Sequence, residues 1–275
     1  MKLFLKTKDY SVSQEEFHLS HDADMDMLIT HPQPEKLEEY YQSESYISHT
    51  DANKNFFDKL YQIIKKYSLY KKMKLIGRYA KGEKNLLDFG AGTGDFMVMA
   101  KKKNWSVAGV EPNCKARELA EAKGILLYPK METLQDNKYQ VITLWHVLEH
   151  LPNLEEQISQ LISKLGKEGI LVIAVPNFRS YDAKYYREFW AAYDVPRHLW
   201  HFSRTTMEKL FSKHKMKIVK IKPMIFDAFY VAMLSEKYKT GRVNFLKAFW
   251  IGLWSNIKAQ GSGEYSSLIY VIQKS

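Results

Sequence analysis

The sequence predicts an α/β fold with a doubly wound, mostly parallel sheet. The chain has 275 residues and is 45% hydrophobic and 14% aromatic, which is enough apolar material for a substantial core. From residue 85 onward, short apolar runs alternate with helical stretches, which is the pattern of successive βα units. A glycine-rich turn joins the first apolar run to the first of these helices. Together these observations favour a parallel sheet covered by helices.

Seven strands are expected, because seven short runs are apolar or rich in β-branched residues and end cleanly. The runs are 85–89, 106–110, 125–128, 140–145, 169–175, 216–224 and 266–274. The expected helices between them are 94–103, 114–122 and 154–165. Ser203 can cap a further helix that ends near residue 214. The last two strands flank an insertion, 225–265, whose aromatic residues recur at nearly helical spacing.

The N-terminal part of the chain has a different composition. Residues 1–50 hold ten acidic residues against four lysines and include the turn signal HPQP, so we expect them to be irregular. A helix is expected over 53–80. We therefore divide the chain into an N-terminal cap, 1–70, and a main domain, 71–275. In that domain 177–202 and 225–265 are expected to form insertions on the substrate side.

The charge of the chain is unevenly spread. The formal net charge is +10, and since residues 1–50 carry −6, the rest of the chain carries +16. The lysines are scattered rather than interleaved with aromatic residues in one stripe, which favours a solvated surface over a nucleic-acid interface. For the aromatic insertion, a lid or a core is favoured over a membrane-surface helix, which leaves peripheral membrane contact as the weaker reading.

The single cysteine, Cys114, excludes an intramolecular disulfide and a cysteine-rich zinc cluster, in keeping with a reducing compartment. The N-terminal stretch MKLFLKTKDY is charged where a signal peptide would be apolar. No apolar run approaches the roughly 20 residues of a transmembrane helix. We therefore expect a soluble, cytoplasmic protein. The oligomeric state is not predicted.

The stretch LLDFGAGTGDF, residues 86–96, is the most specific in the chain. An apolar strand ends at Asp88, Gly90, Gly92 and Gly94 follow at alternate positions, and a helix begins near Asp95. Glycines in such a turn allow positive φ and let a ligand approach the backbone. The dinucleotide fingerprint has its third glycine one residue later and seats a pyrophosphate, which the carboxylate of Asp88 would repel. The turn is therefore expected to favour a cationic head group over a phosphate.

This stretch resembles motif I of the class I S-adenosylmethionine-dependent methyltransferases. The resemblance implies a Rossmann-like, doubly wound sheet with six parallel strands and one antiparallel strand, and S-adenosylmethionine as cofactor. The next strand ends in Glu111, an acid placed to accept hydrogen bonds from two ribose hydroxyls. The resemblance further implies that Met131 and Glu132 border the adenine. The full set expected to bind the cofactor is Asp88, Gly90, Ala91, Gly92, Gly94, Phe96, Glu111, Pro112, Met131, Glu132 and Trp145.

The stretch WHVLEHL, residues 145–151, contains the H-x-x-E-H spacing of some zinc peptidases. A helix there is disfavoured, because Pro152 follows and a β-branched strand precedes it. The stretch also resembles an E-x-x-E-H segment of the ubiquinone-biosynthesis O-methyltransferase branch, some members of which hold a divalent cation. Glu149 and His150 match that pattern, but His146 replaces the first glutamate, and hard cations prefer oxygen ligands.

A softer metal held by His146, Glu149 and His150 with His198 or His201 is left as an alternative. We favour a role for Glu149 and His150 in ordering the loop by hydrogen bonding, and we assign no metal. Trp145 and His146 are expected to line the cofactor or substrate pocket.

The long connection 177–202 follows the fifth strand and overhangs the expected cleft. Its segment PRHLWHFS also resembles the same methyltransferase branch. His198 is the first candidate for a general base and His146 the second, since imidazole titrates near neutral pH. We expect methyl transfer to a small-molecule or lipid-like acceptor, with O-methylation favoured. An RNA-directed methyltransferase and a non-catalytic S-adenosylmethionine-binding protein are the alternatives, and a dinucleotide oxidoreductase is disfavoured.

Overall fold

The computed structural model describes residues 1–41, 56–134 and 138–275, with side chains from residue 62 onward in the helix that begins at Phe56. The chain forms two compact units. Unit 1 comprises Met1–Ser43, Leu148–Pro152 and Ala174–Tyr270, and unit 2 comprises Glu44–Val147, Asn153–Ile173 and Val271–Ser275. The division into a cap and a main domain at residues 70 and 71 stays a prediction.

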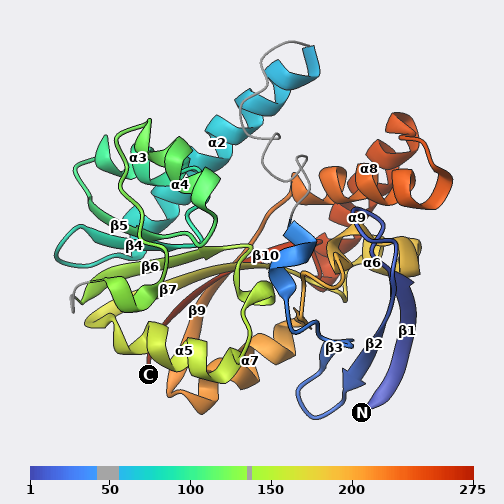
Figure 1. Cartoon of the computed structure of the whole chain (residues 1–275), viewed down its shortest axis with the longest axis horizontal. Coiled ribbons are helices and arrows are strands. Elements are labelled where there is room, and N and C mark those ends of the chain that lie inside the picture. The colour runs from blue at the N-terminus through green and yellow to red at the C-terminus, as the bar shows by residue number, and fades with distance from the viewer. Residues whose placement is uncertain (42–55, 135–137) are drawn as a thin grey trace. The chain divides into compact units, whose positions relative to one another are not determined.

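A six-stranded sheet has the order β5-β4-β6-β7-β10-β9, so β10 lies between β7 and β9 (Figure 1). The strands are β4 (Asn85–Phe89), β5 (Ser106–Val110), β6 (Tyr139–Trp145), β7 (Leu165–Pro176), β9 (Met216–Pro223) and β10 (Ser267–Lys274). β4 pairs in parallel with both β5 and β6, and its residues Leu86 and Leu87 are fully buried. Six of the seven predicted strands are thus formed, as parts of an α/β sheet.

The predicted strand 125–128 does not form. Only one parallel bridge, between Val110 and Tyr128, remains of it. The physical reason lies at its two ends: Gly124 has φ 75°, and Pro129 has no N–H to continue a ladder. Between them Ile125 and Leu127 are buried and Leu126 is 70% exposed, so the run keeps the alternating burial of an edge strand without its ladder of hydrogen bonds. The prediction of seven strands is therefore not confirmed.

The helices of unit 2 follow the sequence expectations closely. They are α2 (Phe56–Tyr79), α3 (Asp95–Lys101), α4 (Cys114–Glu121) and α5 (Leu154–Ser163). Asn113 caps α4, because its side chain accepts a hydrogen bond from the backbone N–H of Ala116 at 3.0 Å. The helix predicted over 53–80 is confirmed from residue 56, and residues 53–55 lie outside the described part of the chain.

Unit 1 contains a four-stranded sheet of order β1-β2-β3-β8 (Figure 1). Its strands are β1 (Lys2–Lys8), β2 (Glu16–Asp22), β3 (Met27–His31) and β8 (Trp200–His201). All of its pairs are antiparallel. The expectation that residues 1–50 are irregular is wrong for these strands. The acidic composition of residues 1–50 concealed a period of two in β2, in which Phe17 and Leu19 alternate with the more exposed Glu16 and His18.

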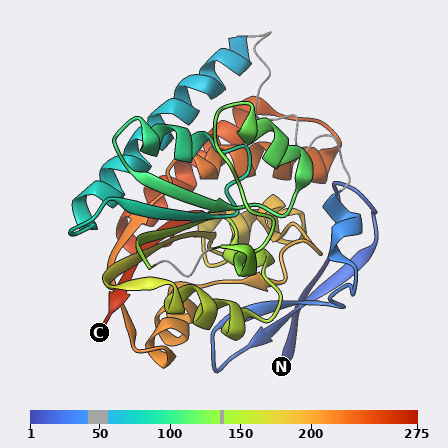
Figure 2. The same cartoon turned by 60° about the vertical axis from the view of Figure 1, so that its left-hand side comes forward.

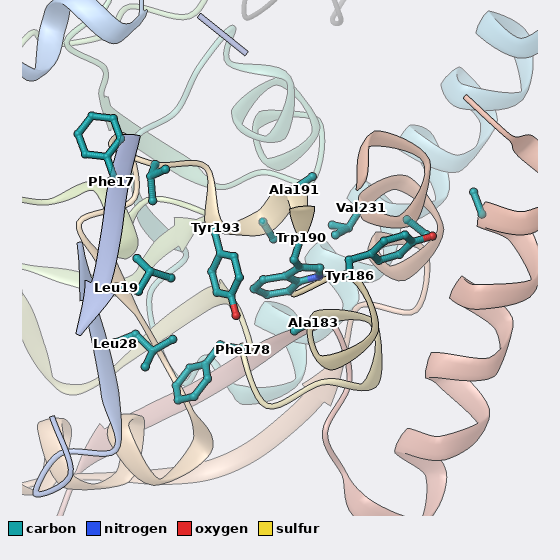
Figure 3. Packing of buried hydrophobic residues seen from close by; sticks show 14 residues of the cluster. Phe17, Leu19, Leu28, Phe178, Ala183, Tyr186, Trp190, Ala191, Tyr193 and Val231 are labelled. Carbon is teal, nitrogen blue, oxygen red and sulfur yellow. The ribbon is translucent and has the colours of Figure 1, made fainter. Parts of the chain in front are cut away.

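The core of unit 1 joins this sheet to the segment that follows β7. Phe17, Leu19 and Leu28 from the sheet pack with Trp190 and Tyr193 (Figure 3). The Nε1 atom of Trp190 donates to Asp182 at 2.7 Å, and the hydroxyls of Ser255 and Ser266 donate to the same carboxylate at 2.7 Å each. Most of the connection predicted as an overhanging loop is therefore packed core rather than mobile chain.

The remaining helices of unit 1 are α6 (Tyr181–Tyr186), α7 (Arg204–Lys213), α8 (Asp227–Thr240) and α9 (Phe245–Ser262). Ser203 caps α7 as predicted, with a reciprocal hydrogen bond to Thr206. Helices α8 and α9 confirm that the insertion before the last strand is helical, and they lie side by side in both views (Figure 1; Figure 2). Within the described ranges, no helix is long and apolar enough to cross a membrane.

Candidate active site

The glycine loop between β4 and α3 is built so that one of its glycines faces open space. Gly90, Gly92 and Gly94 all have positive φ, at 74°, 53° and 75°. A Cβ at Gly90 would meet Val147 at 2.4 Å, and one at Gly94 would meet Ala120 at 3.1 Å, so these two glycines serve close packing. A Cβ at Gly92 would meet no described atom within 4 Å. Gly92 is therefore the position at which a ligand can approach the backbone.

The carboxylate of Glu111, the residue after β5, accepts a hydrogen bond from the glycine loop. Its Oε2 accepts the backbone N–H of Gly92 at 2.8 Å, and its Oε1 accepts the N–H of Asn113 at 3.0 Å. A carboxylate has about four lone-pair sites, so these bonds fix its orientation and leave others for the hydroxyls of a ligand. Glu111 thus lies against the glycine loop as predicted, while its role toward a ribose stays a prediction.

Asp88 lies at the end of β4 and is almost fully buried. The hydroxyl of Thr143, on β6, donates to its Oδ1 at 2.5 Å. Burial raises the pKa of Asp88 to about 7, and this outweighs the lowering by the Thr143 hydrogen bond and the Lys72 charge; Glu111 raises it further. A carboxyl with a pKa near 7 is about half protonated at neutral pH, and a nearby cation shifts it toward the charged form.

Trp145, the last residue of β6, carries two contacts and one unsatisfied donor. The ammonium of Lys72, on α2, lies 4.1 Å from its ring centroid, and the ring of Phe96 packs against it edge-on at 5.4 Å. The Trp145 Nε1 atom is buried and has no hydrogen-bond partner among the described residues. Since buried donors are normally paired, this atom is a candidate for a ligand contact. Sequence reasoning missed Lys72, because one lysine in a lysine-rich helix gives no signal.

The other predicted cofactor contacts lie on the same unit. Met131 is buried and Glu132 is exposed, at the start of a short 3-10 helix. Pro112 is exposed and its carbonyl accepts a hydrogen bond from Arg117 at 2.6 Å. The residues therefore fit the implied cofactor in three respects: an open glycine, an oriented carboxylate and a buried acid that favours a cation. Each of these contacts stays a prediction.

The stretch after β6 turns sharply rather than forming a helix. His146 has φ 57°, a left-handed conformation that is uncommon for a residue with a side chain and is often stored at functional sites. A single 3-10 turn, Leu148–His150, follows. This geometry excludes the zinc-peptidase arrangement, in which both histidines would lie on one sustained helix.

Three side chains of unit 1 converge near this turn. Glu149, His150 and His198 each offer a ligand atom, and these atoms lie within 4.8 Å of one another. The backbone also ties the segments together, because the N–H of Leu199 donates to the carbonyl of Glu149 at 2.8 Å. A cation that accepts mixed nitrogen and oxygen ligands could be held here. The assignment of no metal stays a prediction, and so does the loop-ordering role of Glu149 and His150.

His198, the first candidate base, is buried, and its ring orientation is fixed. Its Nδ1 lies 2.9 Å from the carbonyl of Ala192, which can only accept, so we assign the ring proton to Nδ1. Burial, with the His150 charge, lowers the pKa of His198 well below its usual range. The ring is therefore neutral near pH 7, with Nε2 as its unprotonated nitrogen.

Arg197 is the buried cation that sequence reasoning did not single out. Its guanidinium contacts Asp9 at 2.9 Å and Asp194 at 2.7 Å, and its side chain is 2% exposed. It also donates to the carbonyl of Tyr40 at 3.1 Å. Arg197 thus ties the N-terminal strands to the segment that carries His198. Arg197 and Asp9 lie 188 residues apart in the sequence, which is why no local pattern revealed this pair.

Comparisons with known proteins show the family of the chain. A model of the methyltransferase domain family matches residues 61–221. No curated protein sequence matches the chain. Among solved structures, magnesium protoporphyrin IX methyltransferase from Synechocystis PCC 6803, crystallised with S-adenosylhomocysteine, is 14% identical. That similarity covers 86% of this chain and 97% of that one, with a TM-score of 0.55.

Two further structures show the same fold. A SAM-dependent methyltransferase from Archaeoglobus fulgidus is 17% identical, with 80% of this chain and all of that one covered at a TM-score of 0.52. The structure named StiE O-MT is 16% identical, with 80% and 78% covered at a TM-score of 0.52. Because the family model spans more than half of the residues, the chain belongs to the methyltransferase domain family and is an S-adenosylmethionine-dependent methyltransferase.

Proposed function

We propose that the protein transfers a methyl group from S-adenosylmethionine to an oxygen atom of a small-molecule or lipid-like acceptor. The observation that carries this proposal is the buried His198, whose Nδ1 contact with the carbonyl of Ala192 leaves Nε2 as the unprotonated nitrogen. An acceptor hydroxyl must lose its proton as the new C–O bond forms, and a neutral imidazole accepts such a proton. Other support comes from the resemblance of WHVLEHL and PRHLWHFS to the ubiquinone-biosynthesis O-methyltransferase branch.

The residues proposed to bind the methyl donor are Gly92, Glu111, Asp88 and Trp145. S-adenosylmethionine supplies an electrophilic methyl group on a positively charged sulfur. Toward it, Gly92 leaves the backbone accessible and Glu111 orients hydroxyl groups through its free lone pairs. Asp88 contributes negative charge at the strand end. The chain's own part in catalysis is therefore to position the donor, exclude water and accept the proton.

The acceptor class is argued from the neighbours as well as from the site. One neighbouring structure is named for magnesium protoporphyrin IX and another for O-methylation, so this fold serves small-molecule acceptors in those proteins. The basic charge of residues 51–275 keeps an RNA-directed methyltransferase as the second candidate, since lysine-rich surfaces attract phosphates. The scattered lysines favour the small-molecule or lipid-like acceptor.

A transfer experiment tests the proposal. Purified protein is incubated with S-adenosylmethionine labelled in its methyl group and with a cell extract separated into RNA, aqueous metabolites and organic-soluble lipids. We expect label in the metabolite or lipid fraction, as a methyl ether or ester by mass spectrometry. The Glu111→Ala variant should transfer none, and His198→Asn should transfer at least about tenfold more slowly while binding S-adenosylhomocysteine normally.

Other outcomes decide against the proposal in distinct ways. Label that appears in the RNA fraction and is lost after ribonuclease treatment would support the RNA-directed alternative, which also predicts binding that weakens steeply with salt. Label on nitrogen or carbon would reject O-methylation. Binding of S-adenosylhomocysteine with no transfer to any fraction would favour a non-catalytic binding protein.

The raised pKa of Asp88 predicts how donor binding depends on pH. The free protein holds a proton on this carboxyl below about pH 7, and a cationic ligand favours the charged form. Affinity for S-adenosylmethionine should therefore rise as the pH increases through about 7, with proton release on binding. Calorimetry in buffers of different ionisation enthalpy measures that release. Asp88→Asn should bind more weakly and without the pH dependence; an unchanged pH profile would exclude Asp88 as its source.

A further inference from the structure

Helix α9 has an inverted arrangement of large and small side chains. Its buried face consists of small residues, chiefly Ala248, Gly252 and Ser255, whereas large apolar residues face solvent. The exposed set is Leu246, Phe249, Trp250, Trp254 and Ile257. Leu246 is 78% exposed and Trp250 64% exposed. These residues recur three or four apart, so they form one apolar stripe along the helix.

The orientation of α9 is fixed by its packing, so the stripe cannot simply rotate inward. A Cβ at Gly252 would lie 2.8 Å from the ring of Phe229 on α8, which shows how closely the two helices approach. The hydroxyl of Ser255 donates to the buried Asp182, and the side chain of Asn256 donates to the carbonyl of Ile225 at 3.0 Å. The stripe is thus held outward by the core of unit 1. Contiguous apolar patches of this kind on a folded surface mark interaction sites.

The charge around the stripe indicates the kind of partner. α9 contains no acidic residue, and residues 227–262, which include α8 and α9, hold five lysines and arginines against two acidic residues. Lys258 lies 5.3 Å from the ring centroid of Trp254, at one end of the stripe. At the other end, before α9, the loop carries the exposed Arg242. Trp and Phe flanked by Lys and Arg are typical of helices that lie in the interface of an anionic bilayer.

A second copy of the chain is a poorer partner for this face. Two identical faces in a symmetric dimer would bring two helix pairs of net charge +3 together, which opposes association. An anionic surface instead gains from the same charge.

We propose that the exposed face of α9 docks the protein on anionic phospholipid membranes, with Trp250 and Leu246 entering the headgroup region and the flanking basic residues contacting lipid headgroups. The helix then lies along the surface. This docking does not depend on which acceptor is methylated, and it is measurable without donor or acceptor.

Vesicle binding tests the proposal with the full-length protein. Flotation or sedimentation is measured with vesicles of phosphatidylcholine alone and of phosphatidylcholine mixed with phosphatidylserine. We expect binding to the mixed vesicles, a blue shift of tryptophan emission, and at least about tenfold weaker partitioning for Leu246→Ser/Trp250→Ser. The matched control, Leu126→Ser/Tyr70→Ser, removes one exposed leucine and one exposed aromatic residue from unit 2 and should bind like the parent protein.

The same variants also distinguish docking from self-association. Circular dichroism and melting temperatures are measured to check that both double variants are folded. Absence of parent binding to anionic vesicles, or equal loss in both double variants, would overturn the proposal. A dimer in sedimentation velocity that dissociates in Leu246→Ser/Trp250→Ser, with no vesicle binding, would assign the face to a second copy instead.

Discussion

Gly92→Val abolishes binding of S-adenosylhomocysteine while the protein stays folded. A Cβ at this position meets no described atom within 4 Å, so the substitution causes no clash inside the protein. It places two methyl groups in the open space that faces the glycine loop, where the ligand has to approach the backbone. Isothermal calorimetry should show at least about a hundredfold loss of affinity, or no measurable heat.

Gly82→Val is the matched control for the cost of backbone strain. Gly82 also has positive φ, 76°, and also has open space at its Cβ, but it lies in the turn before β4. Both variants should lose roughly 1–2 kcal/mol of stability, because left-handed φ is costly for a residue with a Cβ. Only Gly92→Val should lose ligand binding. Equal affinities in the two variants would show that the loop is not the donor site.

Arg197→Met lowers the free energy of unfolding by about 3–5 kcal/mol, because it leaves the buried Asp9 and the partly exposed Asp194 without their cation. The melting temperature should fall by on the order of 10 °C. Arg179→Met is the matched control. Arg179 also pairs with an aspartate, Asp26, but its side chain is 41% exposed, so its loss should cost no more than about 1 kcal/mol.

The pH dependence of the two proteins provides a second readout. Despite the opposing effect of burial, the hydrogen bonds and charge of Arg197 lower the pKa values of Asp9 and Asp194. A lowered native pKa gives stability that is complete above the unfolded value of about 4 and is lost as the pH falls further. In Arg197→Met the same carboxylates prefer protonation, so the difference in melting temperature should shrink between about pH 7 and pH 4.5. A constant difference would contradict the charge argument.

The sequence was most informative where local chemistry decides the structure. The strand ends at Asp88 and Glu111 and the turn of glycines between β4 and α3 follow from apolar runs, glycine freedom and parallel topology. The cap of α7 at Ser203 was predictable for the same reason, since a hydroxyl and its backbone partner lie three residues apart. Such features need no knowledge of distant residues.

Features that depend on distant partners were missed. The apolar residues of β2 and β3 become buried in a cluster that includes Trp190, and their acidic neighbours suggested an irregular segment. Lys72 and Arg197 resemble other basic residues until the folded chain places an aromatic ring or two carboxylates beside them. Burial and charge pairing at long range, rather than local preference, decided these positions.

The pairing of β3 with β8 also constrains how the chain can fold during synthesis. On the side of β3 away from β2, Leu28 and Ile29 pair with His201 and Trp200. The carboxylate of Asp9 likewise pairs with Arg197. The first three strands are therefore made long before the residues that complete their sheet and neutralise their buried acid. Because contacts this distant in sequence form slowly, an emerging chain exposes an unfinished sheet edge while about 170 further residues are translated. The N-terminal strands, although synthesised first, belong to the parts of unit 1 that can be completed only late.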